Sequence, residues 1–193
     1  MATVSLYFQL HQPYRLRRYS VFDTEPRYFD SYRNAEIVKK VAERCYVPAT
    51  TRLLELLKKH EGRFRVSFSI TGVLADQLKV HVPEAIDLLA QIAETGCAEF
   101  LNETYHHSLA FLYSRDEFRE QLDMHRQMIE QLFGQTPRVF RNTELIYNND
   151  VAYYVAGLNR FVGALAEGAD TVLNGRAPTQ VFAPPNAPQL KLL

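Results

Sequence analysis

The spacing of hydrophobic residues alternates along the chain between a pattern typical of strands and a pattern typical of helices. Residues 4–10 and 64–70 are short runs rich in aromatic and β-branched side chains, and the second run alternates with a period of two. Between them, apolar residues recur on one helical face, with an interruption expected at Pro48 and an end at Gly62: Ile37, Val38, Val41, Cys45, Leu53, Leu54, Leu56 and Leu57. This part of the chain predicts a strand, a helical stretch and a second strand.

The middle of the chain repeats the alternation with clearer boundaries. Pro83 suits the first turn of a helix, and Gly96 suits the left-handed residue that closes one. A short strand is expected over residues 97–101. The helix after it has the strongest signals, because Ser114 and Glu117 form a capping box ahead of an apolar stripe that ends near Gly134: Phe118, Leu122, His125, Ile129 and Leu132.

The remaining elements are short: a strand over 139–142, a helix capped by Asn149 or Asp150 and ending at Gly157, and strands over 161–165 and 189–193. Strands that alternate with helices imply parallel pairing through right-handed crossovers, in a barrel or in a doubly wound open sheet. At about 30 residues for each strand–helix–strand step, a closed barrel would need further chain. We therefore expect an α/β fold in one domain over residues 1–193 that is part of a longer enzyme.

Composition narrows the class of protein. The chain has 193 residues, 47% of them apolar and 12% aromatic, which is enough for one real core. Lys+Arg and Asp+Glu both number 22, so no net field favours nucleic acid or an acidic membrane. No apolar run approaches the roughly 20 residues of a membrane span, and no leader pattern is present at residue 1, which predicts a cytoplasmic protein. Cys45 and Cys97 lack metal-ligand spacing and are expected to be reduced structural thiols.

Polar side chains follow the predicted strands at the point where each one ends. They are His11 and Gln12 after the first strand, Thr71 after the second, Glu103, His106 and His107 after the third, and Arg141, Asn142, Thr143, Glu144 and Tyr147 at the end of the fourth. In parallel α/β folds the loops at the carboxyl ends of the strands project from one face and bind ligands there. This recurrence makes an enzyme plausible, with Glu144 as the carboxylate that meets the ligand.

Each of these residues also has a plainer interpretation. His11 can be an ordinary loop histidine, and Glu144 a loop salt bridge. We prefer a solvated loop charge for Glu103. His106 and His107 are adjacent and point apart, so at most one of them belongs to a site. Alternation leaves Glu99 on either face of its strand, with Phe100 as the better helix-facing residue.

Several reaction classes lack their sequence signals. The six histidines form neither HxxxH nor HExxH, so no metal and no cofactor are expected. A GxSxG elbow and phosphate-binding glycine loops are also missing. A carboxylate mechanism remains, in which a retaining glycosidase uses a nucleophile and an acid/base about 5–5.5 Å apart. Glu144 is our candidate nucleophile, with Arg141 expected to help keep it ionised and with Tyr147 and Asn142 expected to orient it.

Three segments in order resemble glycoside hydrolase family 57. They are His11-Gln12-Pro13 after the first strand, Gly96-Cys97-Ala98-Glu99 at the third, and Arg141-Asn142-Thr143-Glu144-Leu145 after the fourth. The resemblance implies a (β/α)7-type barrel, incomplete in this chain, and a retaining enzyme without cofactor that acts on α-glucans, as α-amylases, 4-α-glucanotransferases and branching enzymes do. It implies that Glu144 is the nucleophile, that His11 binds substrate, and that Glu99 is the acidic residue of the second region. The segment His106-His107-Ser108-Leu109 resembles the α-amylase-type branch.

One part of the family pattern is missing. The family's acid/base is an aspartate in a fourth region, and Asp170, in Gly168-Ala169-Asp170, does not carry that motif. We therefore expect the aspartate beyond residue 193 and expect this chain alone to be inactive. Two alternatives stay open, a polysaccharide deacetylase-like metal hydrolase and a non-catalytic carbohydrate-binding relative.

Overall fold

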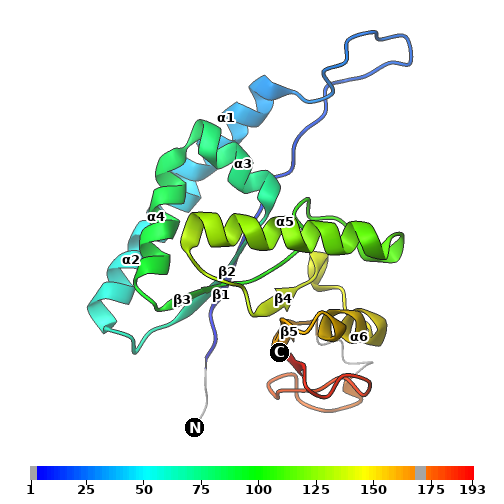
Figure 1. Ribbon diagram of the computed structural model, residues 1–193. Helices are drawn as coiled ribbons and strands as arrows, with labels where there is room; N and C mark the ends of the chain where they lie inside the picture. The colour runs from blue at the N-terminus through cyan, green and yellow to red at the C-terminus, as the bar shows by residue number, and fades with distance from the viewer. Residues whose placement is uncertain (1–3, 168–172) are drawn as a thin grey trace. The chain divides into compact units, whose positions relative to one another are not determined.

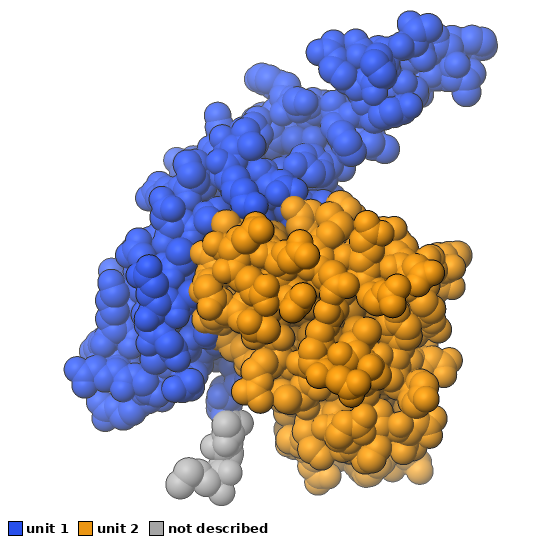
Figure 2. All heavy atoms as spheres, viewed as in Figure 1, with its two compact units in different colours: residues 1–98 blue, residues 99–193 orange. Residues whose placement is uncertain are grey.

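The computed structural model describes residues 4–167 and 173–193, and Asp170 lies outside them. The chain divides into two compact units, Met1–Ala98 and Glu99–Leu193. Figure 2 colours the two units separately, and Figure 1 labels their helices and strands.

The first unit contains two complete strands, which are parallel. Strand β1 (Tyr7–Leu10) pairs with β2 (Val66–Ile70), with Leu10 opposite Ile70. Both strands begin later than the sequence predicts, and the first residues of the predicted strand 4–10 stay exposed, with Val4 at 81%. Parallel pairing places the carboxyl ends of both strands at the same edge, so the residues that follow them become neighbours.

The first helical stretch is continuous where a break was expected. Helix α1 (Ser31–Val41) passes into a π-helical turn, η1 (Ala42–Tyr46), and then into α2 (Val47–His60). The predicted interruption at Pro48 is wrong, because Pro48 lies in the first turn of α2, where its missing N–H is not needed. The irregularity lies in η1 instead.

Helix α3 (Gly72–His81) was not predicted, whereas α4 (Pro83–Glu94) was. The first turns of α3 are buried on nearly every side, so they show no alternation of apolar and polar faces that the sequence could reveal. Thr71 caps α3 by accepting a hydrogen bond from the Leu74 N–H. Helix α2 packs beside α4, and α1 packs beside α3 (Figure 1).

Parallel strands also form the sheet of the second unit. The chain enters this unit within β3 (Ala98–Phe100), and Asn102 just beyond it bridges Phe140 in β4 (Val139–Arg141). Strand β4 pairs in parallel with β5 (Gly163–Leu165), and β5 with β6 (Lys191–Leu192). All four strand positions were predicted, with ranges one to three residues longer than the observed strands.

Helices α5 (Arg115–Phe133) and α6 (Asn149–Gly157) cover this sheet, with the 3-10 turns η2 (Ala110–Leu112) and η3 (Thr143–Leu145) in the loops. The core is rich in aromatic rings, and Phe118 of α5 meets Phe140 of β4 edge-on at 5.9 Å. The predicted cap of α6, Asn149 or Asp150, was one or two residues late, because Asn148 accepts the hydrogen bond from the Val151 N–H. None of the helices in the described part of the chain is long and apolar enough to cross a membrane.

Replacing Ser114 tests whether its side chain stabilises the start of α5. The Ser114 side chain accepts from the Glu117 N–H at 3.2 Å. Ser114→Ala should lower the free energy of unfolding by about 1 kcal/mol, because the Glu117 N–H loses its partner. Urea denaturation measures the change. Ser114→Asp keeps an acceptor there and should stay close to the parent protein; equal losses in both variants would contradict the capping role.

Candidate functional site

In the first unit, the ends of β1 and β2 meet as predicted. His11 follows β1, and its Nδ1 lies 2.9 Å from the buried Thr71 Oγ1, which follows β2. The Tyr46 hydroxyl donates to the His11 carbonyl at 3.3 Å, and Gln77 Nε2 donates to the Gln12 carbonyl at 2.8 Å. Both the backbone and the ring of His11 are therefore held in place, as a residue that orients a ligand must be.

In the second unit, Glu103 is the residue whose surroundings differ most from expectation. Its side chain is 0% exposed, so the preferred interpretation as a solvated loop charge is wrong. Arg141 Nη1 lies 3.5 Å from Glu103 Oε2, and His107 Nδ1 lies 3.4 Å from the same oxygen. A buried carboxylate needs cationic partners. Glu103 obtains two, and both distances exceed an ideal hydrogen bond, so attraction between charges matters more here than bond geometry.

The missed role of Glu103 had a signal in the sequence. Asn102, Glu103 and Thr104 form a polar run directly after the apolar Phe100 and Leu101, just as the Glu144 segment follows β4. All three polar residues are fully buried. A polar run after a strand is buried when other strand ends close over it, and that depends on contacts between distant segments.

His107 links the buried carboxylate to the candidate nucleophile. Its Nε2 lies 2.9 Å from Glu144 Oε1, while its Nδ1 faces Glu103. The exposed fraction of the side chain rises along this chain of contacts, from 0% for Glu103 to 10% for His107 and 70% for Glu144. Glu144 therefore has a fixed partner and is open to solvent, which rules out an occluded ion pair within this unit.

Backbone strain gathers at the same place. His107, Glu144 and Leu145 all have left-handed φ angles, of 54°, 55° and 56°. For residues with a Cβ this conformation costs about 1–2 kcal/mol, and such residues cluster at functional sites. The two residues that share the 2.9 Å contact are thus both held in unusual conformations.

Hydroxyl groups hold the two loops against each other. Thr104 Oγ1 and Thr143 Oγ1 lie 2.9 Å apart, and the Thr143 hydroxyl donates to the Ser108 carbonyl at 2.8 Å. Ser108 Oγ in turn donates to Gln121 Oε1 of α5 at 2.9 Å. These bonds join the loop after β3 to the loop after β4, so the spacing between His107 and Glu144 is fixed by several contacts.

The pKa of the His107 imidazole is raised above its ordinary value. The hydrogen bond to Glu103 is the main cause, partial desolvation opposes it, and the contact with Glu144 adds to it. A charged imidazole is therefore favoured between the two carboxylates. Its charge stabilises the ionised form of Glu144, which is the form that a nucleophile needs.

Three of the remaining predicted site residues also lie in the second unit. Arg141, expected to help keep Glu144 ionised, has one guanidinium nitrogen 3.5 Å from the buried Glu103 carboxylate. Tyr147 donates to Asn149 Oδ1 at 3.2 Å, and burial raises the pKa of its hydroxyl. His106 is exposed, and its ring meets that of Tyr105 edge-on, so the two adjacent histidines do point apart.

Glu99 and Phe100 lie on opposite faces of β3. Phe100 is buried and stacks on Phe133 of α5 at 4.1 Å, as expected of the helix-facing residue. Glu99 is exposed; partial desolvation raises the pKa of its carboxyl group, and the charge of Arg138 opposes that shift. Asn142, expected to orient Glu144, donates to the Ile146 carbonyl at 2.9 Å and so braces the turn that carries Glu144.

A pocket of about 430 Å³ opens beside the Glu144 turn in the second unit. Its lining includes Ala166 and Glu167, which follow β5, and Leu193, which follows β6. The Glu167 N–H donates to the Leu145 carbonyl at 3.2 Å, which ties the pocket wall to the Glu144 turn. Tyr147, Arg176 and Phe182 also line it, so this rim offers aromatic faces and polar groups together.

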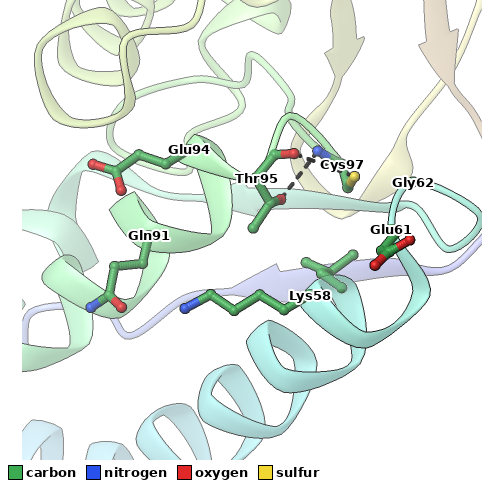
Figure 3. A pocket seen from close by; sticks show the side chains of 8 residues that line it. Lys58, Glu61, Gly62, Gln91, Glu94, Thr95 and Cys97 are labelled. Atoms are coloured by element: carbon green, nitrogen blue, oxygen red, sulfur yellow. Dashed lines mark hydrogen bonds between the residues drawn. The ribbon is translucent and has the colours of Figure 1, made fainter.

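Another pocket, of about 530 Å³, lies in the first unit at the opposite ends of its strands (Figure 3). Gly62 precedes β2 and Cys97 precedes β3, so both belong to the amino ends. Cys97 donates to Thr95 through its N–H and its thiol, as the dashed lines show. Ligands of parallel α/β folds bind at the carboxyl ends, so this pocket is separate from the candidate site.

The described residues contain no group of three or more His, Cys, Asp or Glu side chains placed to hold a metal ion. Cys45 and Cys97 are both free thiols, as expected.

The fold and the site are those of an α/β protein that presents a carboxylate at the carboxyl ends of its strands. Parallel strands alternate with helices, and the loops after β3 and β4 present an exposed carboxylate braced by a buried one. The chain belongs to glycosyl hydrolase family 57, whose family model matches residues 5–193. This confirms the resemblance inferred from the three sequence segments.

A relative from Methanocaldococcus jannaschii, whose name marks it as a candidate α-amylase, is 37% identical over 193 residues. The match covers 98% of this chain and 41% of the relative, so the chain spans less than half the length of that protein.

Solved structures share the fold at low sequence identity. The 4-α-glucanotransferase of Thermococcus litoralis has a TM-score of 0.68 at 14% identity, over 92% of this chain and 24% of that one. The branching enzyme of Pyrococcus horikoshii has a TM-score of 0.66 at 15% identity, over 98% of this chain and 46% of that one. A structure from Mycobacterium smegmatis, described as a polysaccharide deacetylase candidate, has a TM-score of 0.58 at 18% identity, over 98% of this chain and 57% of that one. The predicted fold class is confirmed: α/β of the (β/α)7 type, incomplete in this chain.

Replacing Glu103 tests the electrostatic link. His107 is charged below an ordinary histidine pKa of about 6.5 in both folded and unfolded chains, so its pairing stabilises the fold fully there. That contribution is lost as the pH rises through the raised pKa of the folded state. Glu103→Gln should lower the pKa of His107 and shift this loss to lower pH. NMR titration of the imidazole measures the pKa, and urea denaturation against pH measures the stability.

Glu120→Gln, on the exposed face of α5, is the matched control and should leave the titration of His107 unchanged. Glu103→Gln should also destabilise the fold by about 3–5 kcal/mol, because one partner of a buried charge cluster is lost. An unchanged pKa of His107 in a folded Glu103→Gln variant would contradict the link.

Proposed function

We propose that the complete protein is a retaining enzyme that cleaves α-1,4-glucans, with Glu144 as the nucleophile. The observation that carries this proposal is the exposed carboxylate of Glu144 held 2.9 Å from an imidazole that is itself braced by a buried carboxylate. A nucleophile of this kind must be ionised, fixed in place and open to a sugar. Family membership and the names of the relatives supply the substrate class.

The reaction proceeds in two displacements. A Glu144 carboxylate oxygen attacks the anomeric carbon and forms a glycosyl ester, while the glycosidic oxygen leaves with a proton from a general acid. We expect that acid to be an aspartate beyond residue 193. The same group, now a base, then takes a proton from an incoming hydroxyl that attacks the anomeric carbon and releases Glu144. Water as the second nucleophile gives hydrolysis, and a sugar hydroxyl gives transfer.

The other predicted site residues receive supporting roles in this proposal. We assign residues 1–193 to one catalytic barrel domain, with His11 and Gln12 binding sugar hydroxyls. We also propose that Tyr147 contacts a sugar ring, and its position in the lining of the pocket beside the Glu144 turn supports this. Arg141 acts through Glu103 and so positions the nucleophile. Roles in binding substrate for Glu99, His106 and His107 stay predictions, as does a cytoplasmic location.

Two alternative functions can be distinguished from this proposal by experiment. A deacetylase-like metal hydrolase shares the fold of the Mycobacterium smegmatis structure, and stoichiometric zinc in elemental analysis of the purified protein would favour it. A non-catalytic relative would bind oligosaccharides and cleave none.

Glu144→Gln in the complete protein should reduce turnover of α-glucans by at least roughly 10³-fold, because an amide cannot form the glycosyl ester. Binding of maltooligosaccharides, measured by calorimetry, should persist, since the side chain keeps its size. Glu120→Gln is the matched control and should retain full activity. Normal turnover by Glu144→Gln would reject the assignment.

The stereochemistry of the first product tests the retaining mechanism separately. Proton NMR of an early time course should show the α-anomer forming first and the β-anomer appearing only by mutarotation, because two displacements restore the original configuration. A β-anomer formed first would mean a single displacement, and Glu144 would then be a base.

A further inference from the structure

The segment between β1 and α1, residues 13–30, holds an unusual number of exposed apolar side chains. Of the 20 large apolar side chains that are exposed among the described residues, seven lie in this segment. Figure 1 shows it in blue, running out from the end of β1 and returning to α1. We call it the aromatic arm. A cluster of exposed apolar side chains in one segment is a sign of an interaction site.

The aromatic arm is ordered by its own hydrogen bonds. Its two sides meet in one antiparallel bridge between Leu16 and Phe29, where the Arg17 N–H donates to the Tyr28 carbonyl at 2.9 Å and the Asp30 N–H donates to the Arg15 carbonyl at 2.9 Å. A turn closes the outer end, where the Ser20 N–H donates to Asp23 Oδ2 at 2.6 Å. The exposed rings are therefore held on a built framework.

The rings form two pairs along the arm. Tyr14 and Phe29 lie near its base with centroids 5.1 Å apart, and Tyr19 and Tyr28 lie further out at 5.2 Å. Phe22 stands at the turn and is 90% exposed. Tyrosine offers an apolar face and a hydroxyl on one rigid side chain, which suits a ligand that is itself part apolar and part hydroxylated.

The base of the arm is continuous with the strand end that carries His11 and Gln12. Arg15 Nη2 donates to Gln12 Oε1 at 2.8 Å. The Arg15 N–H donates to Oδ1 of the buried Asn34 in α1, also at 2.8 Å. A ligand held at Gln12 would therefore meet Tyr14 and Phe29 next as it leaves the strand end.

We propose that the aromatic arm is a platform for the outer sugars of an α-1,4-glucan chain, a proposal that rests on the proposed function. The arm contains four arginines and three acidic residues, so its charges nearly cancel and an anionic polymer gains little there. A neutral polysaccharide presents flat C–H faces to the rings and hydroxyls to the polar groups between them. The arm thus contributes to the binding of long chains and leaves the cleavage step to the strand ends.

Replacing the outer ring pair tests this platform in the complete protein. Tyr19→Leu/Tyr28→Leu keeps apolar bulk and removes the flat rings. We expect its affinity for glycogen, measured by retardation in glycogen-containing gels, to fall roughly tenfold. Its kcat and KM for maltotetraose should stay within about twofold of the parent protein. Tyr113→Leu/Tyr153→Leu removes two exposed tyrosines of the second unit and should leave both measurements unchanged.

Three results would overturn the platform. They are unchanged glycogen affinity in Tyr19→Leu/Tyr28→Leu, equal losses on glycogen and maltotetraose, and a change of oligomeric mass in light scattering with glycogen affinity intact, which would assign the arm to a second copy of the chain. If the Leu pair fails to fold, Tyr14→Leu alone is measured in the same way and must weaken glycogen binding. Retardation is also measured in the Glu144→Gln background, so failure of the proposed chemistry and failure of the platform give different results.

Discussion

The buried carboxylate of Glu103 is the constraint on which the candidate site of the second unit depends. Taking a carboxylate out of water costs on the order of several kcal/mol, so the fold must supply cations to it. Arg141 comes from β4 and His107 from the loop after β3, and both face Glu103 Oε2. These contacts hold the loop after β3 against the end of β4. They therefore fix the position of Glu144, which lies just beyond β4.

His107 connects the buried carboxylate of Glu103 to the exposed carboxylate of Glu144. One imidazole nitrogen faces a fully buried carboxylate and the other an exposed one, so a single side chain connects the core to the candidate nucleophile. The left-handed backbone of His107 and Glu144 is costly, and the charge contacts and the Thr104–Thr143–Ser108 bonds offset that cost. Such preorganisation is what a displacement at an anomeric carbon needs, because the attacking oxygen must already be in position.

Local signals predicted much of this fold, and contacts between distant segments determined the rest. The cap at Ser114 and the stop at Gly134 were predicted because they depend on a few adjacent residues. Helix α3 was missed because burial on nearly every side removes its periodicity. Glu144 was predicted from its place after a strand, whereas the pairing of Glu103 and His107 with Arg141 depends on the loop after β3 closing against the end of β4, which a pattern along the chain cannot show.

The proposed reaction requires a covalent bond between the Glu144 carboxylate and the sugar. The most direct measurement is to treat the complete protein with a fluorinated α-glucosyl fluoride, which forms the glycosyl ester quickly and releases it slowly, and then to digest the protein and map the adduct by mass spectrometry. We predict one glucosyl adduct, on the peptide that contains Glu144. An adduct on another carboxylate, with Glu144 unmodified, would contradict the account.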